Sequence, residues 1–403
     1  MSQGETGSFD MSIRNIFTRD FTLCFLAQYG ISSVLFVLAP TLPIYLSKLG
    51  TGEVEIGLLI GIASIFSLIL RPFVGKGLSK IPEKKFMLAG TLILSFSLAA
   101  LLWAPPFWPL LVVRSFQGIC AALFFTASFT LIANISPEEH RGQSIGFYFL
   151  SNNVAFALAP SLGMALINSL NFPKNFITLF LLCTGLSLCS LGLILKLETR
   201  EVSGPANRPS QKQPFLNRSA VPAAVMAGLS NIIWSAMVVF FPLYAINNGV
   251  ANPGLFFTAF AAVLILGRSL GGRILDLYAK EREKVILPCL TSYILSMTLL
   301  AFSRTLPMFI LAAIIWGMGN TFLYPMFLTI ALDRAGADRG AALGTFLAIA
   351  DLGVGIGPVL MGLILNWTSY RVMFLCLSSV GVIIFLYFQF FVRRQGGTAY
   401  ADL

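Results

Sequence analysis

Two ionisable residues lie inside long apolar runs of the sequence, where a charge could do chemistry. Arg114 falls within the run 108–132 and Asp351 within the run 341–365. A charge at the centre of a membrane helix costs about 2.5–3.5 kcal/mol on insertion scales, so it marks a candidate functional site. Arg114 cannot release its proton, but it could tune a carboxylate or hold an anionic group. Asp351 is the only acid that we place near mid-membrane, so it is the best candidate for a proton carrier or for a site that binds a cationic substrate group.

Each of these two residues also has a purely structural interpretation. Backbone carbonyls could neutralise Arg114, and helix–helix hydrogen bonds could hold the Asp351 carboxyl in its neutral form. The sequence leaves both interpretations open. The only histidine, His140, follows two glutamates in a polar segment, and we interpret it as a solvated loop residue.

The composition shows what kind of element must position these residues. The chain is 57% hydrophobic and only 11% charged, whereas soluble domains are about 25% charged. Its mean hydropathy is +0.83. Apolar runs of roughly 20 residues recur along the chain, and each is long enough to cross a bilayer as a helix. They are too continuous for the alternating strands of a membrane barrel. The sequence therefore predicts an all-α membrane protein.

We expect twelve transmembrane helices and one polar break. The break, 196–218, is rich in proline and charge, which predicts a linker. It separates a six-helix bundle in 1–195 from a second in 219–403. The expected helices are 21–46, 56–75, 86–103, 108–132, 143–167, 176–195, 220–246, 255–275, 285–302, 308–332, 341–365 and 372–392.

An internal repeat supports this division. A basic segment that begins at Arg71 recurs at Arg268, about half the chain away, and we place both copies in helix-to-helix loops. The pairs are Arg71 with Arg268, Gly75 with Gly272, Lys76 with Arg273 and Ser79 with Asp276. Weaker echoes at similar spacing are Pro43-Ile44-Tyr45 with Pro242-Leu243-Tyr244, Arg141-Gly142 with Arg339-Gly340, and Ala159-Pro160 with Gly357-Pro358. Two pseudo-symmetric parallel bundles explain the repeat.

The distribution of charge predicts the orientation in the membrane. The formal net charge is +10, and most Lys and Arg residues fall on one side of the expected helices. That side is cytoplasmic, so we expect an integral inner-membrane protein with both termini in the cytoplasm. A nucleic-acid partner is disfavoured because the chain has no basic, aromatic-bearing soluble module. The polar segment 1–20 lacks the features of a cleaved signal peptide.

The six cysteines all lie in apolar runs without metal-type spacing, so neither a metal nor a cofactor is expected. Paired catalytic carboxylates and a Ser/His/Asp arrangement are likewise missing from the sequence. We therefore do not expect an enzyme.

Two segments of the sequence resemble patterns of a known family. The segment Arg114-Ser115-Phe116-Gln117-Gly118 matches the pattern R-x-x-Q-G, and the repeated basic segment is similar to G-x-L-x-D-R-x-G-R-[KR]. Both patterns are typical of the major facilitator superfamily, and the sequence most resembles its twelve-helix drug:proton antiporters. The resemblance implies that Arg114 takes part in proton coupling. The first basic copy departs from the pattern, because Ser79 and Pro82 stand where Asp and Gly are expected.

The resemblance also assigns two structural roles. The basic segments would form a latch between the halves on the cytoplasmic side, and the alternative is that their charges only fix topology and bind anionic headgroups. The latch residues are Arg71, Gly75, Lys76, Arg268, Gly272, Arg273 and Asp276. Small residues and prolines would let the fifth helix approach the eighth, and the eleventh approach the second. These are Ala159, Pro160 and Gly163 in the fifth helix, and Gly353, Gly357 and Pro358 in the eleventh.

A central cavity should be lined by the first, fourth, seventh and tenth helices. Its polar and aromatic side chains suit a neutral or amphiphilic small molecule, because Arg114 is the only charge that such a ligand would meet. The expected lining residues are Gln28, Tyr29, Ser32, Gln117, Asn231, Trp234, Trp316, Asn320 and Tyr324.

We therefore expect a monomeric secondary active transporter that works by alternating access and exports a small molecule in exchange for protons. Asp351 and Arg114 would couple transport to protons. The first helix offers Gln28 and Tyr29 where antiporters more often carry an acid. The alternative is therefore a transporter of a sugar or another metabolite, for uptake or export, that is not driven by proton antiport.

Overall fold

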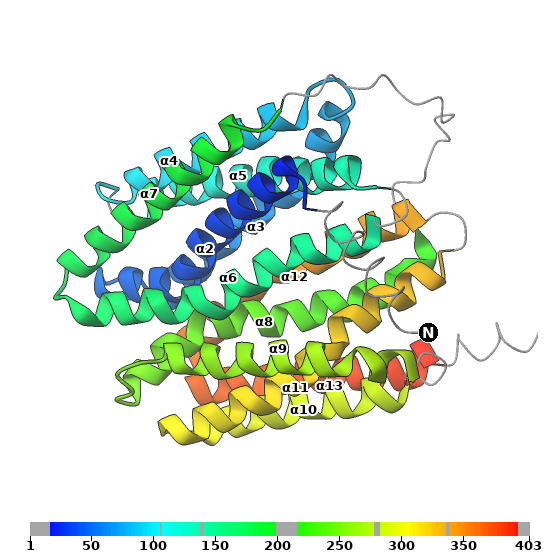
Figure 1. Ribbon diagram of the computed structural model, residues 1–403. Helices are drawn as coiled ribbons and strands as arrows, with labels where there is room; N and C mark the ends of the chain where they lie inside the picture. Colours follow the sequence, from blue (N-terminus) through cyan, green and yellow to red (C-terminus); the bar gives the residue numbers. More distant parts are fainter. Residues whose placement is uncertain are drawn as a thin grey trace, which may run out of the picture. The chain divides into compact units, whose positions relative to one another are not determined.

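The computed structural model describes residues 17–104, 107–137, 141–198, 217–277, 283–335 and 339–393. The side chains of 141–143, 269–277, 283 and 339–340 lie outside this description, as does His140. Over these ranges the chain forms twelve α-helices (Figure 1). They are α2 (Arg19–Lys48), α3 (Glu53–Gly77), α4 (Glu83–Ala100), α5 (Trp108–Ile135), α6 (Arg141–Ser169), α7 (Lys174–Leu195), α8 (Val221–Asn247), α9 (Gly254–Leu277), α10 (Glu283–Phe302), α11 (Leu306–Asp333), α12 (Arg339–Trp367) and α13 (Tyr370–Tyr387).

Every predicted helix corresponds to one of these, and most extend a few residues beyond the predicted ends. The extension corrects one prediction: the basic segments do not form loops. Arg71, Gly75 and Lys76 lie in the last turns of α3, and the backbone from Arg268 to Asp276 is part of α9. Long basic side chains can extend from a helix end toward water while the backbone stays hydrogen-bonded in the helix, so charge alone does not end a helix.

Several helix ends follow from local sequence. Proline occupies the first turn of α5, α8 and α11, where no intrahelical N–H bond is lost. The helices α2 and α8 end in matching turns at Gly50 and Gly249, which have φ of 82° and 79°. In each turn the residue after the glycine donates back to a carbonyl five residues earlier, Thr51 to Leu46 and Val250 to Ala245. These left-handed terminations add a further pair to the sequence repeat.

The chain packs as two units whose boundary cuts through α2 and α3. The first contains residues up to Leu38 and the region from Ile65 to the linker. The second contains Ala39–Ser64 and the chain after the linker. The end of α2 and the first half of α3 therefore pack with the later helices. The division into bundles 1–195 and 219–403, joined by 196–218, remains a prediction.

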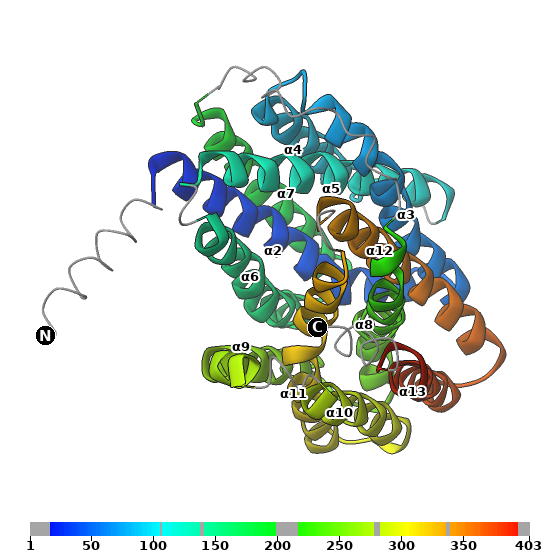
Figure 2. The same ribbon diagram turned by 90° about the vertical axis from the view of Figure 1, so that its right-hand side faces the viewer.

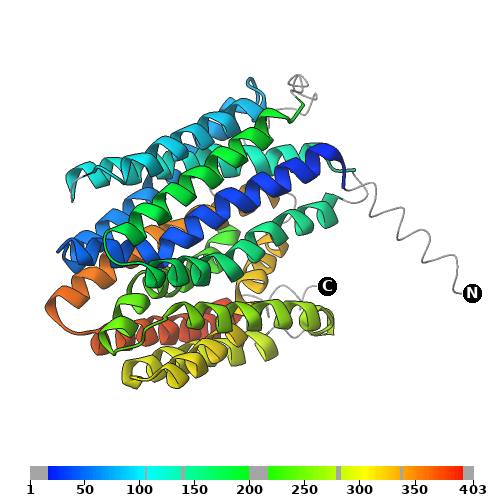
Figure 3. The same ribbon diagram turned by 60° about the vertical axis from the view of Figure 1, so that its left-hand side comes forward.

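In the first unit α4 lies beside α5 and α7, and α6 contacts both of those helices (Figure 3). The start of α2 packs on α7, where Gly30 faces Ser190 and Leu186. At one end of the unit the Lys84 ammonium donates to the Leu197 carbonyl beyond α7, at 2.6 Å. The Asn134 amide donates to Glu83, at 2.7 Å. These bonds tie the ends of α4, α5 and α7 together.

In the second unit α8 is central, and it contacts α11, α12 and α13 (Figure 2). α10 packs between α11 and α13, and α9 packs on α11. From Ile233 to Ala245, every residue of α8 except Trp234 is buried. A helix that is apolar on all sides belongs in a core of this kind, so α8 holds the unit together.

Candidate functional site

The predicted arginine lies on α5 and is held by its neighbour one turn later. The Arg114 guanidinium donates to the Gln117 side-chain oxygen, which lies on the same face of the helix. Gln117 is only 2% exposed, and its Nε2 atom has no hydrogen-bond partner among the described residues. The pair places a fixed positive charge and a buried amide donor side by side, so the two residues can act as one polar group.

A second polar cluster in the first unit joins α2, α5 and α6. The Tyr148 phenol oxygen lies 2.7 Å from the Gln28 Oε1 atom and 2.6 Å from the Ser128 hydroxyl. One turn away, the Ser32 hydroxyl donates to the Asn152 side-chain oxygen at 3.0 Å. All of these groups are neutral, so the cluster satisfies buried polar atoms without a charge.

Sequence reasoning named Gln28 and Ser32 but missed their partners on α6. The available signal was the polar run from Ser151 to Asn153, which is unusual inside an apolar helix. Tyr29, the neighbour of Gln28, is half-buried. The structure therefore adds the helix of Tyr148 and Asn152 to those expected to carry polar side chains.

The predicted polar residues of the second unit occupy separate environments. The Asn231 side-chain amide donates to the Ala350 carbonyl of α12 at 2.9 Å. Trp234, on the same helix as Asn231, is half-buried. The Asn320 side chain is also half-buried, and its Nδ2 atom has no hydrogen-bond partner among the described residues.

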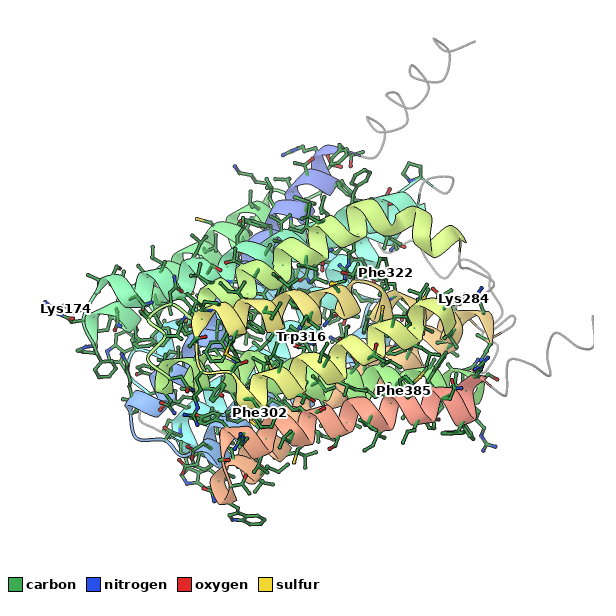
Figure 4. The ribbon with its side chains drawn as sticks, turned by 90° about the horizontal axis from the view of Figure 1, so that it is seen from below. Lys174, Lys284, Phe302, Trp316, Phe322 and Phe385 are labelled. Carbon is green, nitrogen blue, oxygen red and sulfur yellow. The ribbon has the colours of Figure 1, made fainter. Side chains whose placement is uncertain are left out.

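Trp316, labelled in Figure 4, lies on α11 and packs within an aromatic cluster of the second unit. Its ring lies 4.2 Å from the Phe260 ring and 6.4 Å from the Tyr293 ring, centroid to centroid, and the side chain is 0% exposed. Tyr324 lies further along α11. Its ring packs edge-to-face against the Phe346 ring, with 5.4 Å between the ring centroids. Contrary to the expectation of a lining residue, Trp316 is a core residue in this structure.

Asp351 is half-buried on α12, a helix that has backbone contacts on two opposite faces. One face packs on α8. A Cβ atom placed on Gly353 would lie 2.8 Å from the Gly228 carbonyl carbon, and one on Gly357 would lie 2.8 Å from the Ile232 carbonyl oxygen. Gly353 and Gly357 thus bring α12 against α8 of the same unit. This corrects the prediction that they bring it against the second helix, α3.

The other face of α12 does pack on α3, but mainly through other residues. We call this contact the α3–α12 seam; it joins Glu53, Gly57 and Gly61 of α3 to Gly362, Pro358 and Gly355 of α12. A Cβ atom on Gly362 would lie 2.6 Å from the Glu53 carbonyl oxygen. One on Gly57 would meet the Pro358 carbonyl, and one on Gly61 would meet the Gly355 carbonyl. Of the residues predicted for this contact, only Pro358 takes part.

The predicted latch residues are described in part. Arg71 is half-buried, whereas Gly75, Lys76 and Arg268 are exposed. The side chains of Gly272, Arg273 and Asp276 lie outside the described residues. Ser79, at the position of the expected acid, has a local role. Its hydroxyl donates to the Lys76 carbonyl at 2.7 Å, so it satisfies a backbone group at the end of α3.

On α6, Ala159, Pro160 and Gly163 are all buried. Among the described residues no group of three His, Cys, Asp or Glu side chains could hold a metal ion. The groups described above are polar and aromatic side chains and, at Asp351, a carboxyl group.

Ten helices of the described chain are long and apolar enough to cross a membrane, so the fold defines an integral multi-pass membrane protein. The chain belongs to the Major Facilitator Superfamily of transporters, whose family model matches residues 22–282 and 248–400.

The chain is similar to proteins named as an export protein, a resistance protein and a transporter. The chain is 24% identical to the staphylopine export protein of Staphylococcus aureus, over 91% of this chain and 92% of that protein. It is 29% identical to the quinolone resistance protein NorA of the same species over 37% of each chain. An uncharacterised transporter of Pseudomonas aeruginosa is 27% identical over 83% of each chain.

Solved structures share the fold at low sequence identity. The nucleoside transporter NupG aligns with a TM-score of 0.74 at 14% identity, over 92% of this chain and 98% of that one. A POT family transporter in complex with 5-aminolevulinic acid aligns with a TM-score of 0.76 at 13% identity, over 93% and 96% of the two chains. At this identity the likeness concerns the fold alone.

Proposed function

We propose that this protein is a proton-coupled exporter of a small amphiphilic molecule and works by alternating access. The observation that carries the proposal is Asp351, an acid in the middle of a helix that is packed by backbone contacts on two faces. A carboxyl group in such a place is costly to keep ionised, so binding and release of a proton would change how this helix packs. The full-length relationship to an export protein supports the direction of transport.

The proposed movement is a rocking of two bundles, 1–195 and 219–403, about a shared site, with the linker 196–218 between them. The protein would act as a monomer in the cytoplasmic membrane with both termini inside, and it would move its substrate without chemical change. In this mechanism Asp351 exchanges the proton. Arg114, oriented by Gln117, supplies a fixed positive charge that favours the ionised carboxylate or an anionic group of the substrate.

The proposed substrate site uses the neutral polar cluster around Gln28 and Ser32 together with Tyr29, Asn231, Trp234, Asn320 and Tyr324. Neutral amides, hydroxyls and aromatic rings suit a molecule with polar and apolar parts better than a strongly charged one. The Gln117 and Asn320 side-chain amides, which have donors without a partner in the described part of the chain, would donate to acceptor atoms of such a ligand.

One observation favours a second candidate. The α2 position that often carries an acid in antiporters holds Gln28, whose partner Tyr148 is also neutral. A proton cannot be exchanged at this pair of neutral side chains. The second candidate is a transporter of a sugar or another metabolite, for uptake or export, that does not depend on proton antiport.

The test is transport by purified protein in liposomes, with and without an imposed pH gradient. A thermal-shift screen across ligand classes first identifies a substrate. We expect Asp351→Asn to lose most of the gradient-driven flux while it keeps exchange of substrate between the two sides. Asp333→Asn, at the exposed end of α11, is the matched control and should transport as the unmodified protein does. Unchanged gradient-driven flux in Asp351→Asn would rule out this coupling and favour the second candidate.

Arg114 has its own test in the same liposomes. Arg114→Ala should reduce coupled flux at least tenfold, the equivalent of about 1.4 kcal/mol, because it removes the fixed charge. Gln117→Met keeps the arginine but removes the acceptor that orients it, so we expect a smaller loss. Coupled transport that is unchanged in Arg114→Ala would make the arginine structural.

A further inference from the structure

The α3–α12 seam has a regular register that can be followed past its last backbone contact. Glu53 meets Gly362, Gly57 meets Pro358, and Gly61 meets Gly355. The two helices are antiparallel here, and each contact advances about one turn along both. Around the helix axis, the seam residues of α12 lie within about 60° of one another and those of α3 within about 80°.

The next turn of this register brings Asp351 to Ser64. Asp351 is one turn from Gly355. Each residue turns the helix by about 100°, so around the axis of α12 Asp351 lies about 20° from Gly362. Ser64 lies about 20° from the direction of Gly57. Both side chains are half-buried and both belong to the second unit. Asp351 is therefore on the α3 side of α12, opposite the glycines that contact α8.

We propose that Asp351 and Ser64 form a protonation-controlled side-chain pair at the end of the α3–α12 seam. We call this pair the rung. With the carboxyl protonated, its O–H donates to the Ser64 hydroxyl oxygen and the rung packs like the glycine contacts beside it. When the proton leaves, the carboxylate requires water or a cation, and the rung opens to admit it. Ser64 is thus a positioning residue for the proton site. This inference deepens the proposed function and rests on it for the role of the proton.

The surroundings favour a switch of this kind, because the charged residues that face α12 from the elements packed on it lie toward helix ends. Asp351 is the only Asp, Glu, Lys, Arg or His between Ala341 and Trp367. On the face of α3 that forms the seam, the charged residues are Glu53 at one end and Arg71 two turns beyond Ser64. The remaining titratable groups of the elements packed on α12 are Tyr244 on α8, Asp333 and Tyr324 on α11, Tyr370, Arg371, Cys376 and Tyr387 on α13, and Arg218 before α8.

The register is tested by disulfide cross-linking, which does not depend on transport. In a chain whose six native cysteines are replaced by alanine, we expect the pair Ser64→Cys and Asp351→Cys to cross-link rapidly under mild oxidation. Two cysteines can bond only when their Cα atoms lie within about 7 Å and their side chains converge. The matched control is Ala63→Cys with Asp351→Cys, since residue 63 points about 100° away on α3. The proposal would be overturned if the control pair cross-linked as fast as the test pair or faster, or if neither pair cross-linked.

The switch is tested by the reactivity of Ser64→Cys toward a water-soluble thiol reagent across a pH range. Rates are divided by those of Ser47→Cys at the exposed end of α2, which corrects for the pH dependence of an exposed thiol. We expect the ratio to rise at least about fivefold from mildly acidic to mildly alkaline pH, since water enters with the carboxylate. In the Asp351→Asn background it should stay low at every pH. A ratio that rises equally in both backgrounds would refute the switch.

The positioning role has a separate readout in liposomes. Ser64→Ala removes the acceptor for the protonated carboxyl, so the proton should leave more easily. The pH of half-maximal gradient-driven transport should then move to the acid side by about one unit, and Ser64→Thr should restore it. An unchanged pH profile in Ser64→Ala refutes the role of Ser64. If transport proves independent of the pH gradient while the cross-link forms, the proposed coupling fails and the register stands.

Discussion

Gly353 and Gly228 bring the backbones of α12 and α8 into direct contact, and one added methyl group tests how much that contact matters. In Gly353→Ala the new Cβ atom would lie 2.8 Å from the Gly228 carbonyl carbon and 3.0 Å from its Cα atom. Both neighbours are backbone atoms, so no side chain can rotate away and the helices must separate. Overpacking of this kind costs about 1–3 kcal/mol, and the upper end applies to a rigid neighbour.

The same substitution also brings a gain that must be subtracted. Alanine is more favourable than glycine inside a helix by about 0.8–1 kcal/mol. The net expectation for Gly353→Ala is therefore a loss of about 2 kcal/mol in the free energy of unfolding. Gly353→Val, with two further methyl groups, should lose more. Denaturant unfolding of the purified protein in detergent micelles, followed by circular dichroism, measures both values.

Gly344 on the same helix is the matched control. It is exposed, and an added Cβ atom would have no neighbour within 4 Å among the described residues. Gly344→Ala should therefore show only the helix gain and become more stable by about 0.5–1 kcal/mol. The reasoning is refuted if Gly353→Ala is as stable as Gly344→Ala, because the α8–α12 contact would then tolerate a side chain.

Two further stability predictions use the same assay. Tyr148→Phe should lose about 1–3 kcal/mol, because it leaves the buried polar atoms of Gln28 and Ser128 without their shared partner; a loss below about 0.5 kcal/mol would show that water replaces the phenol. Trp316→Ala should lose about 3–5 kcal/mol as a core truncation, whereas Trp103→Ala, at a site that is 77% exposed, should change stability little. Equal effects at the two tryptophans would contradict the core position of Trp316.

The helices could be predicted because a bilayer-length apolar run has few other solutions in lipid. The contact of Arg114 with Gln117 was also within reach of the sequence, since residues three apart share a helix face. The pairing of Gln28 with Tyr148 was not, because 120 residues separate them. Only tertiary packing decides which polar residues of different helices meet.

The face of each small residue was the hardest feature to predict. A membrane helix is apolar on all sides, so hydrophobic periodicity does not tell which side meets a neighbour. α12 carries one glycine set toward α8 and another toward α3, and spacing alone could not assign Gly353 and Gly357 to the first. The same ambiguity placed Trp316 in a cavity, although its ring packs against Phe260.

The two faces of α12 place different demands on a moving protein. Its contact with α8 stays within the later half of the sequence, whereas its contact with α3 joins the two halves of the sequence. Both contacts include glycines that meet backbone atoms of the neighbouring helix, which offers close packing with few side chains to reorder at those points. If the bundles 1–195 and 219–403 rock against each other as proposed, the α3–α12 seam is the contact that must part. At Gly57 this seam is made by backbone atoms and not by interlocked side chains. Asp351 at the end of that seam would then make its parting depend on a proton.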